Sequence, residues 1–361
     1  MAQTKELVLF IPGLSGGEPE KYLNKLIDGL GDYCKGTGIL YKQIEDFSSA
    51  EGASKRQISV QTSDGQQKTI DIQEVYWSDL SPKLSAASSA VKAIRGLSLI
   101  LYWARSASVW MAAAHSKYMF STMLISVTLM LAWYIGILLA LLTALSTAPA
   151  DALAFGGLKL APTVNCLVEI AQFLGGWYTF GTMAILVGYF PVNSVVDISY
   201  ATQCYLLNRE NIFHKARGRI NSSLYDAVRE TAYEKITVVG YSFGAVVAAE
   251  ALASYSGKKY ITFISLGSPL LLMSAKSSRV TSALVKLNSN PLISYWSDFY
   301  SDQDWLCTRS PSTPLENKFT SKQITSSCPL DEKLKGLSHE LYFGDWDVLE
   351  CIVSPPSRLH R

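Results

Sequence analysis

Short apolar runs and helix-forming segments alternate at both ends of the chain. Residues 7–11 are a continuous apolar run, typical of a buried strand in a mostly parallel sheet. Residues 18–32 follow with apolar side chains at helical spacing. A β-branched run at 235–239 leads through a turn into a small-residue helical run at 245–252. The pattern predicts an α/β fold, a mostly parallel sheet with flanking helices. Further strands of this sheet are predicted at 38–41, 259–266 and 291–300, and helices at 196–232 and from about 346.

A hairpin is predicted between the first strand and the middle of the chain. Residues 57–62 and 68–77 flank Asp64-Gly65, a pair typical of tight hairpin turns. Along the second arm, apolar and polar residues alternate at first, and the end of the arm is apolar. This pattern indicates that the arm re-enters the main sheet.

The composition changes at about residue 85. Residues 86–117 are rich in Ala, Ser, Leu and Trp, and their only firm charges are basic. This pattern is typical of a helix that lies at a membrane interface with its basic groups towards the headgroups. A buried amphipathic helix of the soluble domain fits the same pattern. The sequence also leaves open whether the segment covers a site or anchors the chain.

Two stretches without a charged residue follow, at 123–145 and 170–190. A helix of the first length, at about 1.5 Å per residue, covers the roughly 30 Å hydrocarbon core of a bilayer. Basic residues lie outside the pair, so the positive-inside rule places both flanks and both termini in the cytoplasm. We therefore expect an integral membrane protein with two spans, although a fully buried hairpin is the alternative. The insertion covers 85–195 and divides a soluble domain into residues 1–84 and 196–361.

The composition agrees with membrane association and argues against nucleic acid as a partner. The charged fraction is 17%, below the usual quarter or so, and the net charge is only +2. The six cysteines are scattered, without a C-x-x-C pair or a histidine at ligand spacing. We expect reduced cysteines, no metal site and no cofactor. The first residues run directly into an apolar strand, so no cleavable signal peptide is predicted.

The chemistry centres on the G-x-S-x-G motif of Gly240, Ser242 and Gly244. A serine on a sharp strand-to-helix turn needs small residues two positions away on each side. Such a turn exposes the hydroxyl and aims the backbone N–H of Phe243 at a developing oxyanion. The Gly-rich turn after the first strand offers the N–H of Leu14 as a second donor.

A serine nucleophile needs a base, and the base needs a carboxylate that orients it. Of the four histidines, only His339 is expected in a loop after the last strand of the sheet. Asp304 and Asp302 follow the strand at 291–300, where open sheets place ligand-facing residues. We favour Asp304 and keep Asp302 as the alternative. The order of the three groups is then Ser, Asp, His.

Four segments resemble the lipase/esterase branch of the α/β-hydrolase superfamily. They are V-G-Y-S-F-G at 239–244, S-L-G-S-P-L at 265–270, W-S-D-F-Y-S-D-Q-D at 296–304 and H-E-L-Y at 339–342. The resemblance covers roughly residues 5–80 and 220–350 and skips the insertion. The sequence departs from this branch in two places. Asp298 replaces the usual Asn, and Pro12-Gly13 replaces the common His-Gly at the oxyanion turn. The resemblance implies hydrolysis of carboxylic esters by Ser242, His339 and Asp304 through an acyl-enzyme.

Together these features predict a membrane-embedded serine hydrolase that acts on lipids or on acyl esters dissolved in the membrane. A thioesterase or an acyltransferase would use the same triad, so the sequence does not separate these activities. A non-catalytic membrane scaffold with a hydrolase fold is a further alternative, against which the complete set of Ser, Asp and His argues. A channel or transporter is disfavoured because neither predicted span carries an ionisable residue.

Overall fold

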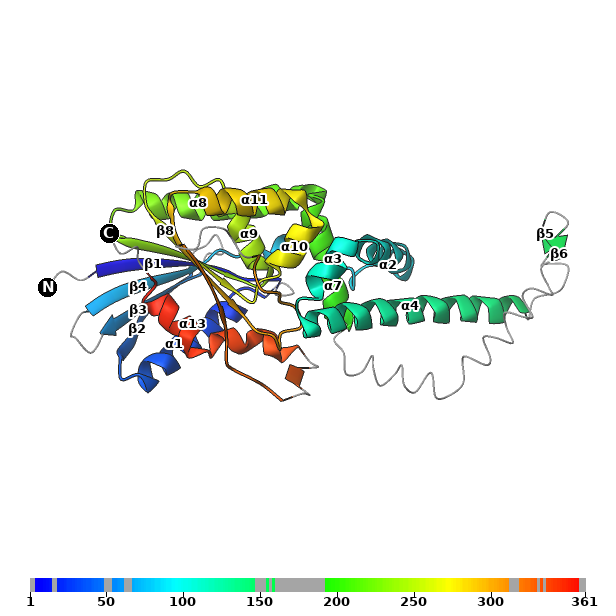
Figure 1. Cartoon of the computed structure of the whole chain (residues 1–361), viewed down its shortest axis with the longest axis horizontal. Coiled ribbons are helices and arrows are strands. Elements are labelled where there is room, and N and C mark those ends of the chain that lie inside the picture. The colour runs from blue at the N-terminus through cyan, green and yellow to red at the C-terminus, as the bar shows by residue number, and fades with distance from the viewer. Residues whose placement is uncertain are drawn as a thin grey trace.

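The computed structural model of the chain consists of an α/β body and a group of helices at one end of it (Figure 1). The described residues are 4–14, 18–48, 54–61, 67–146, 154–155, 158–159, 192–311, 318–329, 332–333 and 336–356.

The body is built on an eight-stranded sheet with the order β10-β9-β8-β7-β1-β4-β3-β2. Strands β4, β1, β7, β8, β9 and β10 pair in parallel, and β3 is antiparallel to both β4 and β2. The predicted α/β class and the return of the hairpin arm to the main sheet are both confirmed. The strands are β1 (Thr4–Ile11), β2 (Leu40–Ser48), β3 (Ser54–Gln61), β4 (Gln67–Glu74), β7 (Lys235–Tyr241), β8 (Ile261–Leu266), β9 (Ile293–Tyr300) and β10 (Phe319–Gln323), with a separate two-stranded pair of β5 (Ala154–Phe155) and β6 (Leu158–Lys159).

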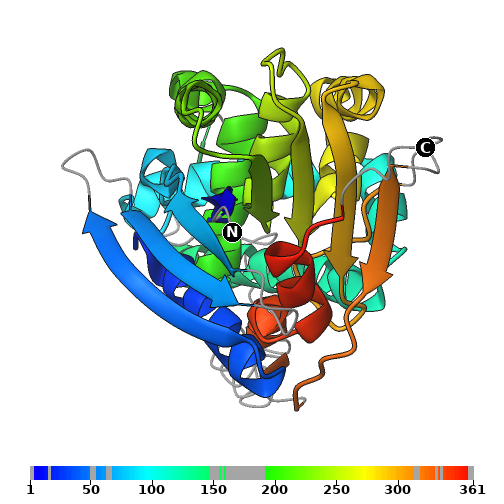
Figure 2. The ribbon, with the colours of Figure 1, turned by 90° about the vertical axis from the view of Figure 1, so that its left-hand side faces the viewer.

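Helices cover both faces of the sheet, which explains the continuous apolar run of the first strand. Leu7, Leu9 and Ile11 of β1 face one hydrophobic core, while Val8 and Phe10 face the other. Figure 2 shows α8 and α11 on one side of the sheet and α1 and α13 on the other. These helices are α1 (Lys21–Gly36), α8 (Ile212–Arg229), α9 (Phe243–Leu252), α10 (Leu270–Lys276), α11 (Ser278–Ser289) and α13 (Trp346–Val353).

The predicted single helix over 86–117 is wrong, because the segment forms two helices. These are α2 (Ser89–Ala104) and α3 (Ala107–Ala113). Ser106 leaves the helical conformation, with φ −97° and ψ 95°, and its carbonyl accepts the first hydrogen bond of α3 from the N–H of Val109. Side chains of both helices, Leu99 and Val109 among them, are buried against the body.

The first predicted span, residues 123–145, lies within α4 (Lys117–Ser146), which runs outward from the body in Figure 1. The second, residues 170–190, lies outside the described residues. Among the helices in the described part of the chain, none combines the length and apolar character needed to cross a membrane. The chain returns to the body through α7 (Val192–Leu206).

Several other elements differ from the sequence-based expectation. The sequence pattern predicts no strand within residues 308–330, but they contribute β10 at the edge of the sheet. The predicted helix over 196–232 is interrupted between α7 and α8 by a short 3₁₀ turn, Arg209–Asn211. His339 lies in a 3₁₀ helix, η4 (Leu337–Phe343), where a loop was expected. A second 3₁₀ turn, η1 (Ser78–Leu80), follows the hairpin.

Helix α1 and η4 approach each other closely at Gly29. A Cβ atom added at this glycine would lie 1.8 Å from the carbonyl oxygen of Phe343. The absence of a side chain on α1 therefore allows η4, which carries His339, to pack at this position.

We expect Gly29→Ala to lower the free energy of unfolding by about 2 kcal/mol, because the overlap with the backbone of Phe343 outweighs the higher helix propensity of alanine. Gly218→Ala is the matched control, since Gly218 lies in α8 with nothing within 4 Å of an added Cβ. This variant should be more stable by about 0.5–1 kcal/mol. Urea unfolding of both variants measures the difference, and equal effects would contradict the close packing of α1 on η4.

Candidate active site

Ser242 lies on the turn between the last residue of β7 and the first residue of α9. Its backbone has φ 55° and ψ −130°, which is a strained conformation for a residue with a side chain. The N–H of Ser242 donates to the carbonyl of Leu266 at the end of the neighbouring strand, at 2.8 Å. The turn is thus held by the adjacent strand β8 in the conformation that the G-x-S-x-G motif predicts.

The two glycines of the motif are required by close contacts. A Cβ on Gly240 would lie 2.5 Å from the Cα of Ala245, and one on Gly244 would lie 2.2 Å from the carbonyl oxygen of Ile11. Gly13, in the turn after β1, approaches the serine itself, because an added Cβ would lie 2.7 Å from the Cβ of Ser242. The ends of β1 and β7 therefore touch at the candidate nucleophile.

Asp304 and His339 form a buried hydrogen-bonded pair. The Nδ1 of His339 lies 2.7 Å from the Oδ2 of Asp304, and the Asp304 side chain is fully buried. The hydroxyl of Tyr342 donates to the same oxygen at 2.9 Å, and the N–H of Leu306 donates to the other at 2.9 Å. Asp302, the alternative acid, is exposed and accepts from the side-chain amide of Gln323. Of the two predicted acids, Asp304 is the one in contact with the histidine.

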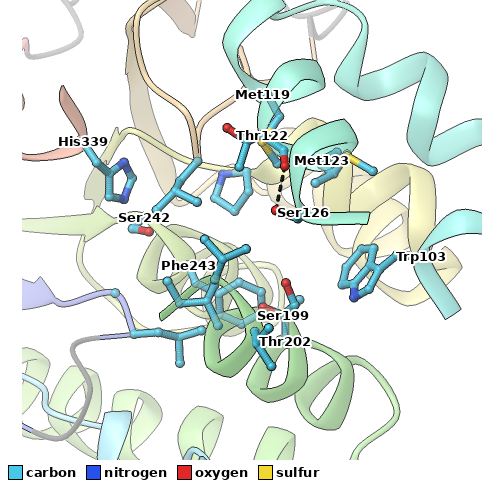
Figure 3. Close-up of a pocket in the computed structure, with 18 of the residues that line it drawn as sticks. Trp103, Met119, Thr122, Met123, Ser126, Ser199, Thr202, Ser242, Phe243 and His339 are labelled. Carbon is cyan, nitrogen blue, oxygen red and sulfur yellow. Dashed lines mark hydrogen bonds between the residues drawn. The ribbon is translucent and has the colours of Figure 1, made fainter. Parts of the chain in front are cut away.

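The imidazole of His339 is fixed on one side and free on the other. The hydroxyl of Tyr241 donates to the backbone carbonyl of His339 at 2.8 Å. The centroids of the Tyr241 ring and the His339 ring lie 5.0 Å apart. The Nε2 atom is buried and has no hydrogen-bond partner among the described residues. His339 and Ser242 line the same cavity and lie next to each other in Figure 3. The free nitrogen is thus available to a group at the serine.

Two further ionisable groups beside Asp304 are kept in their neutral forms. Burial, followed by the negative charge of Asp304, raises the pKa of Tyr342 well above its ordinary value. The same two causes raise the pKa of the buried Cys307 thiol. Tyr342 therefore remains a hydrogen-bond donor to Asp304, and Cys307 remains a thiol.

Both candidate oxyanion donors border the cavity. Phe243 is the first residue of α9, so no helix carbonyl accepts its N–H. Leu14 lies one residue beyond Gly13 and also lines the cavity. The indole N–H of Trp77 donates to the carbonyl of Pro12 at 2.7 Å and fixes the start of this turn.

The cavity has a volume of about 160 Å³ and extends from Ser242 into the helices beyond the sheet. Side chains of α2, α4 and α7 form much of its wall, and among the described residues that line it there is no Asp, Glu, Lys or Arg. Figure 3 labels Trp103, Met123 and Ser199 as representatives of these three helices. The site is thus composed of strand ends of the body on one side and helices from the middle of the chain on the other.

Two parts of the site were not predicted from the sequence, namely the contribution of Tyr342 and the helical wall. The sequence pattern contained Tyr342 three residues after His339, but it gave no indication that the hydroxyl binds Asp304. No local signal marks a residue such as Trp103 or Thr202 as cavity-lining, because this role depends on how α2 and α7 pack over the strand ends.

Within the part of the chain that the structure describes, no three His, Cys, Asp or Glu side chains are placed to hold a metal ion together. Comparisons of the chain with protein-family models, curated proteins and solved structures found no match.

A buried carboxylate anchors the far end of the turn that follows β1. Glu74, the last residue of β4, is 1% exposed, and its Oε2 accepts the backbone N–H of Glu20 at 2.9 Å. The carboxylate of Glu20 binds Arg56, with 2.7 Å between Oε2 and Nη2. Burial is the main cause that raises the pKa of Glu74 from 4.5 to about 7, and the nearby charge of Glu20 adds to it.

This raised pKa predicts a loss of stability as the pH rises. Between about pH 4.5 and pH 7 the folded protein keeps a proton on Glu74 that the unfolded chain has lost, so stability falls through this window. Glu74→Gln removes the titration and keeps an acceptor for the N–H of Glu20. Relative to the wild type, the variant should gain about 2–3 kcal/mol between pH 4.5 and pH 8 in urea unfolding. An equal pH dependence in both proteins would contradict the prediction.

Proposed function

We propose that the protein is a serine hydrolase of the α/β-hydrolase superfamily that cleaves carboxylic esters. In this proposal residues 1–84 and 196–361 form the hydrolase domain, and residues 85–195 are an insertion. The observation that carries the proposal is the hydrogen-bonded pair of Asp304 and His339, whose free Nε2 borders the same cavity as Ser242.

In the proposed reaction, Ser242 attacks the ester carbonyl while His339 Nε2 takes the proton from its hydroxyl. Asp304 holds the imidazole in the tautomer with its proton on Nδ1 and stabilises the imidazolium that forms. The tetrahedral oxyanion is bound by the backbone N–H of Phe243, together with that of Leu14. His339 then returns the proton to the leaving alcohol, and water releases the acyl group by the same steps in reverse order.

A fluorophosphonate probe tests this assignment directly, because it reacts only with an activated serine. We expect the probe to label the wild type and not Ser242→Ala. Asp304→Asn should slow the labelling by roughly a thousandfold or more, since the histidine loses its orienting carboxylate. Asp302→Asn is the matched control and should change the labelling rate by less than about twofold, because Asp302 makes no contact with His339.

Absence of labelling in a folded wild-type protein would refute the proposal and favour the non-catalytic scaffold. Product analysis with water and an added alcohol as competing acceptors separates hydrolysis from acyl transfer, and an acyl thioester tests thioesterase activity.

We further propose that the substrate is a lipid or another acyl ester dissolved in a membrane. The described part of the cavity wall beside Ser242 is mainly apolar and has no charged side chain, which suits an acyl chain. We propose that residues 123–145 and 170–190 hold the protein in the bilayer, with the hydrolase domain and both termini in the cytoplasm. Large apolar side chains are exposed on the helices of the insertion, which suits contact with lipid. In the described residues these are Ile94, Leu97 and Leu101 on α2, Met111 on α3, and Phe120, Leu124 and Leu131 on α4.

Met111 and Val285 form a matched pair for testing this lipid contact, since both side chains are 64% exposed and only Met111 lies in the insertion. We expect Met111→Glu to weaken hydrolysis of a vesicle-borne ester several-fold and to leave hydrolysis of a short soluble ester unchanged. Val285→Glu, on α11, should change neither. Equal effects of the two substitutions on the vesicle substrate would argue against the proposed lipid contact.

A further inference from the structure

Hydroxyl groups lie in the otherwise mainly apolar wall of the cavity, at the end away from Ser242 and His339. Ser199 and Thr202 of α7 line this end, where Figure 3 shows them together with Trp103. Thr202 is only 3% exposed. Neither hydroxyl has a hydrogen bond to any of the described residues.

Hydroxyls in helices usually donate to a carbonyl of the preceding turn, which satisfies them without a ligand. Two hydroxyls on α4, across the cavity, do so. Thr122 donates to the carbonyl of Tyr118 at 3.0 Å, and Ser126 donates to that of Thr122 at 2.6 Å. Ser199 and Thr202 are different, because their donors are unused on the wall of the cavity.

The indole N–H of Trp103, which also lines the cavity, is a third unused donor. The Nε1 of Trp103 is buried and has no hydrogen-bond partner among the described residues. Leaving a buried donor unpaired costs free energy, so polar groups in such positions usually have a partner in the functional complex. An ionised partner is disfavoured, because none of the described residues that line the cavity has a charged side chain to compensate for the loss of water.

We propose that this end of the cavity binds a second, uncharged oxygen of the substrate, through the hydroxyls of Ser199 and Thr202. This inference rests on the proposed esterase function and makes it more specific. The substrate is then an ester whose buried chain carries a hydroxyl, keto or further ester group at some distance from the scissile carbonyl. The oxygen belongs either to the acyl chain or to the alcohol, and the experiment distinguishes the two.

Binding is measured first, on the full-length Ser242→Ala protein, so that the result does not depend on catalysis. The ligands are ethyl octanoate, ethyl hydroxyoctanoates with the hydroxyl at successive carbons, and mono-octanoates of linear diols. We expect one oxygenated ester to bind about tenfold more tightly than ethyl octanoate, the usual effect of one hydrogen bond in a site of this kind. A preferred hydroxyoctanoate assigns the oxygen to the acyl chain, and a preferred diol ester assigns it to the alcohol.

Substitutions then test which side chain causes the tighter binding of the oxygenated ester. Thr202→Val preserves the shape of the side chain and removes the hydroxyl. The affinity for the preferred oxygenated ester, divided by the affinity for ethyl octanoate, should therefore fall towards one. Thr202→Ser retains the hydroxyl and should retain the preference. Thr281→Val is the matched control, because Thr281 lies on α11 outside the cavity and its hydroxyl already donates to the carbonyl of Ser274.

Equal affinity for the plain esters and every oxygenated ester would overturn the inference, and so would a preference that survives both Thr202→Val and Ser199→Ala. Failure of the proposed function has a different signature. In that case the wild type hydrolyses none of these esters and the fluorophosphonate probe does not label Ser242, whatever the binding experiment shows.

Discussion

The candidate site depends on the contact between the end of β1 and the turn at Ser242. Parallel pairing sets Ile11 of β1 opposite Gly240 of β7, so the residues that follow each strand meet at the edge of the sheet. The carbonyl oxygen of Ile11 lies where a side chain on Gly244 would be, and Gly13 packs against Ser242. The strained backbone of Ser242 persists because the surrounding strands determine its position, and the same contact brings the turn of Leu14 to the serine.

The acid and the base lie 62 and 97 residues after Ser242 in the chain (304 − 242 and 339 − 242), yet the fold holds both of them in place. Tyr241, the residue before the serine, holds the backbone of His339 through its hydroxyl. Tyr342, one 3₁₀ turn after His339, binds the carboxylate of Asp304. The phenol ring of Tyr342 in turn lies against Gly267, where an added Cβ would be 2.6 Å from a ring carbon. Each member of the pair is therefore oriented by a neutral donor that packing holds in place.

The sequence was informative where local chemistry determines structure, and less so where packing does. The apolar run of β1, the small residues around Ser242 and the position of Asp304 after β9 each have a local physical cause, so their patterns were visible. The edge strand β10 was not visible, because its residues F-T-S-K-Q are largely solvent-exposed and lack an apolar face. The break at Ser106 was missed because serine occurs both within helices and at their first positions. The cavity wall depends on contacts between helices distant in sequence, which no periodicity encodes.

Helix α4 belongs only in part to the cavity wall. Its first turns form part of the cavity wall, through residues such as Met119 and Met123, and it continues without a break to Ser146. Thirty residues of α-helix form a rod about 45 Å long. Because the helix is unbroken, the side chains that border the cavity and the outermost turns share one backbone element.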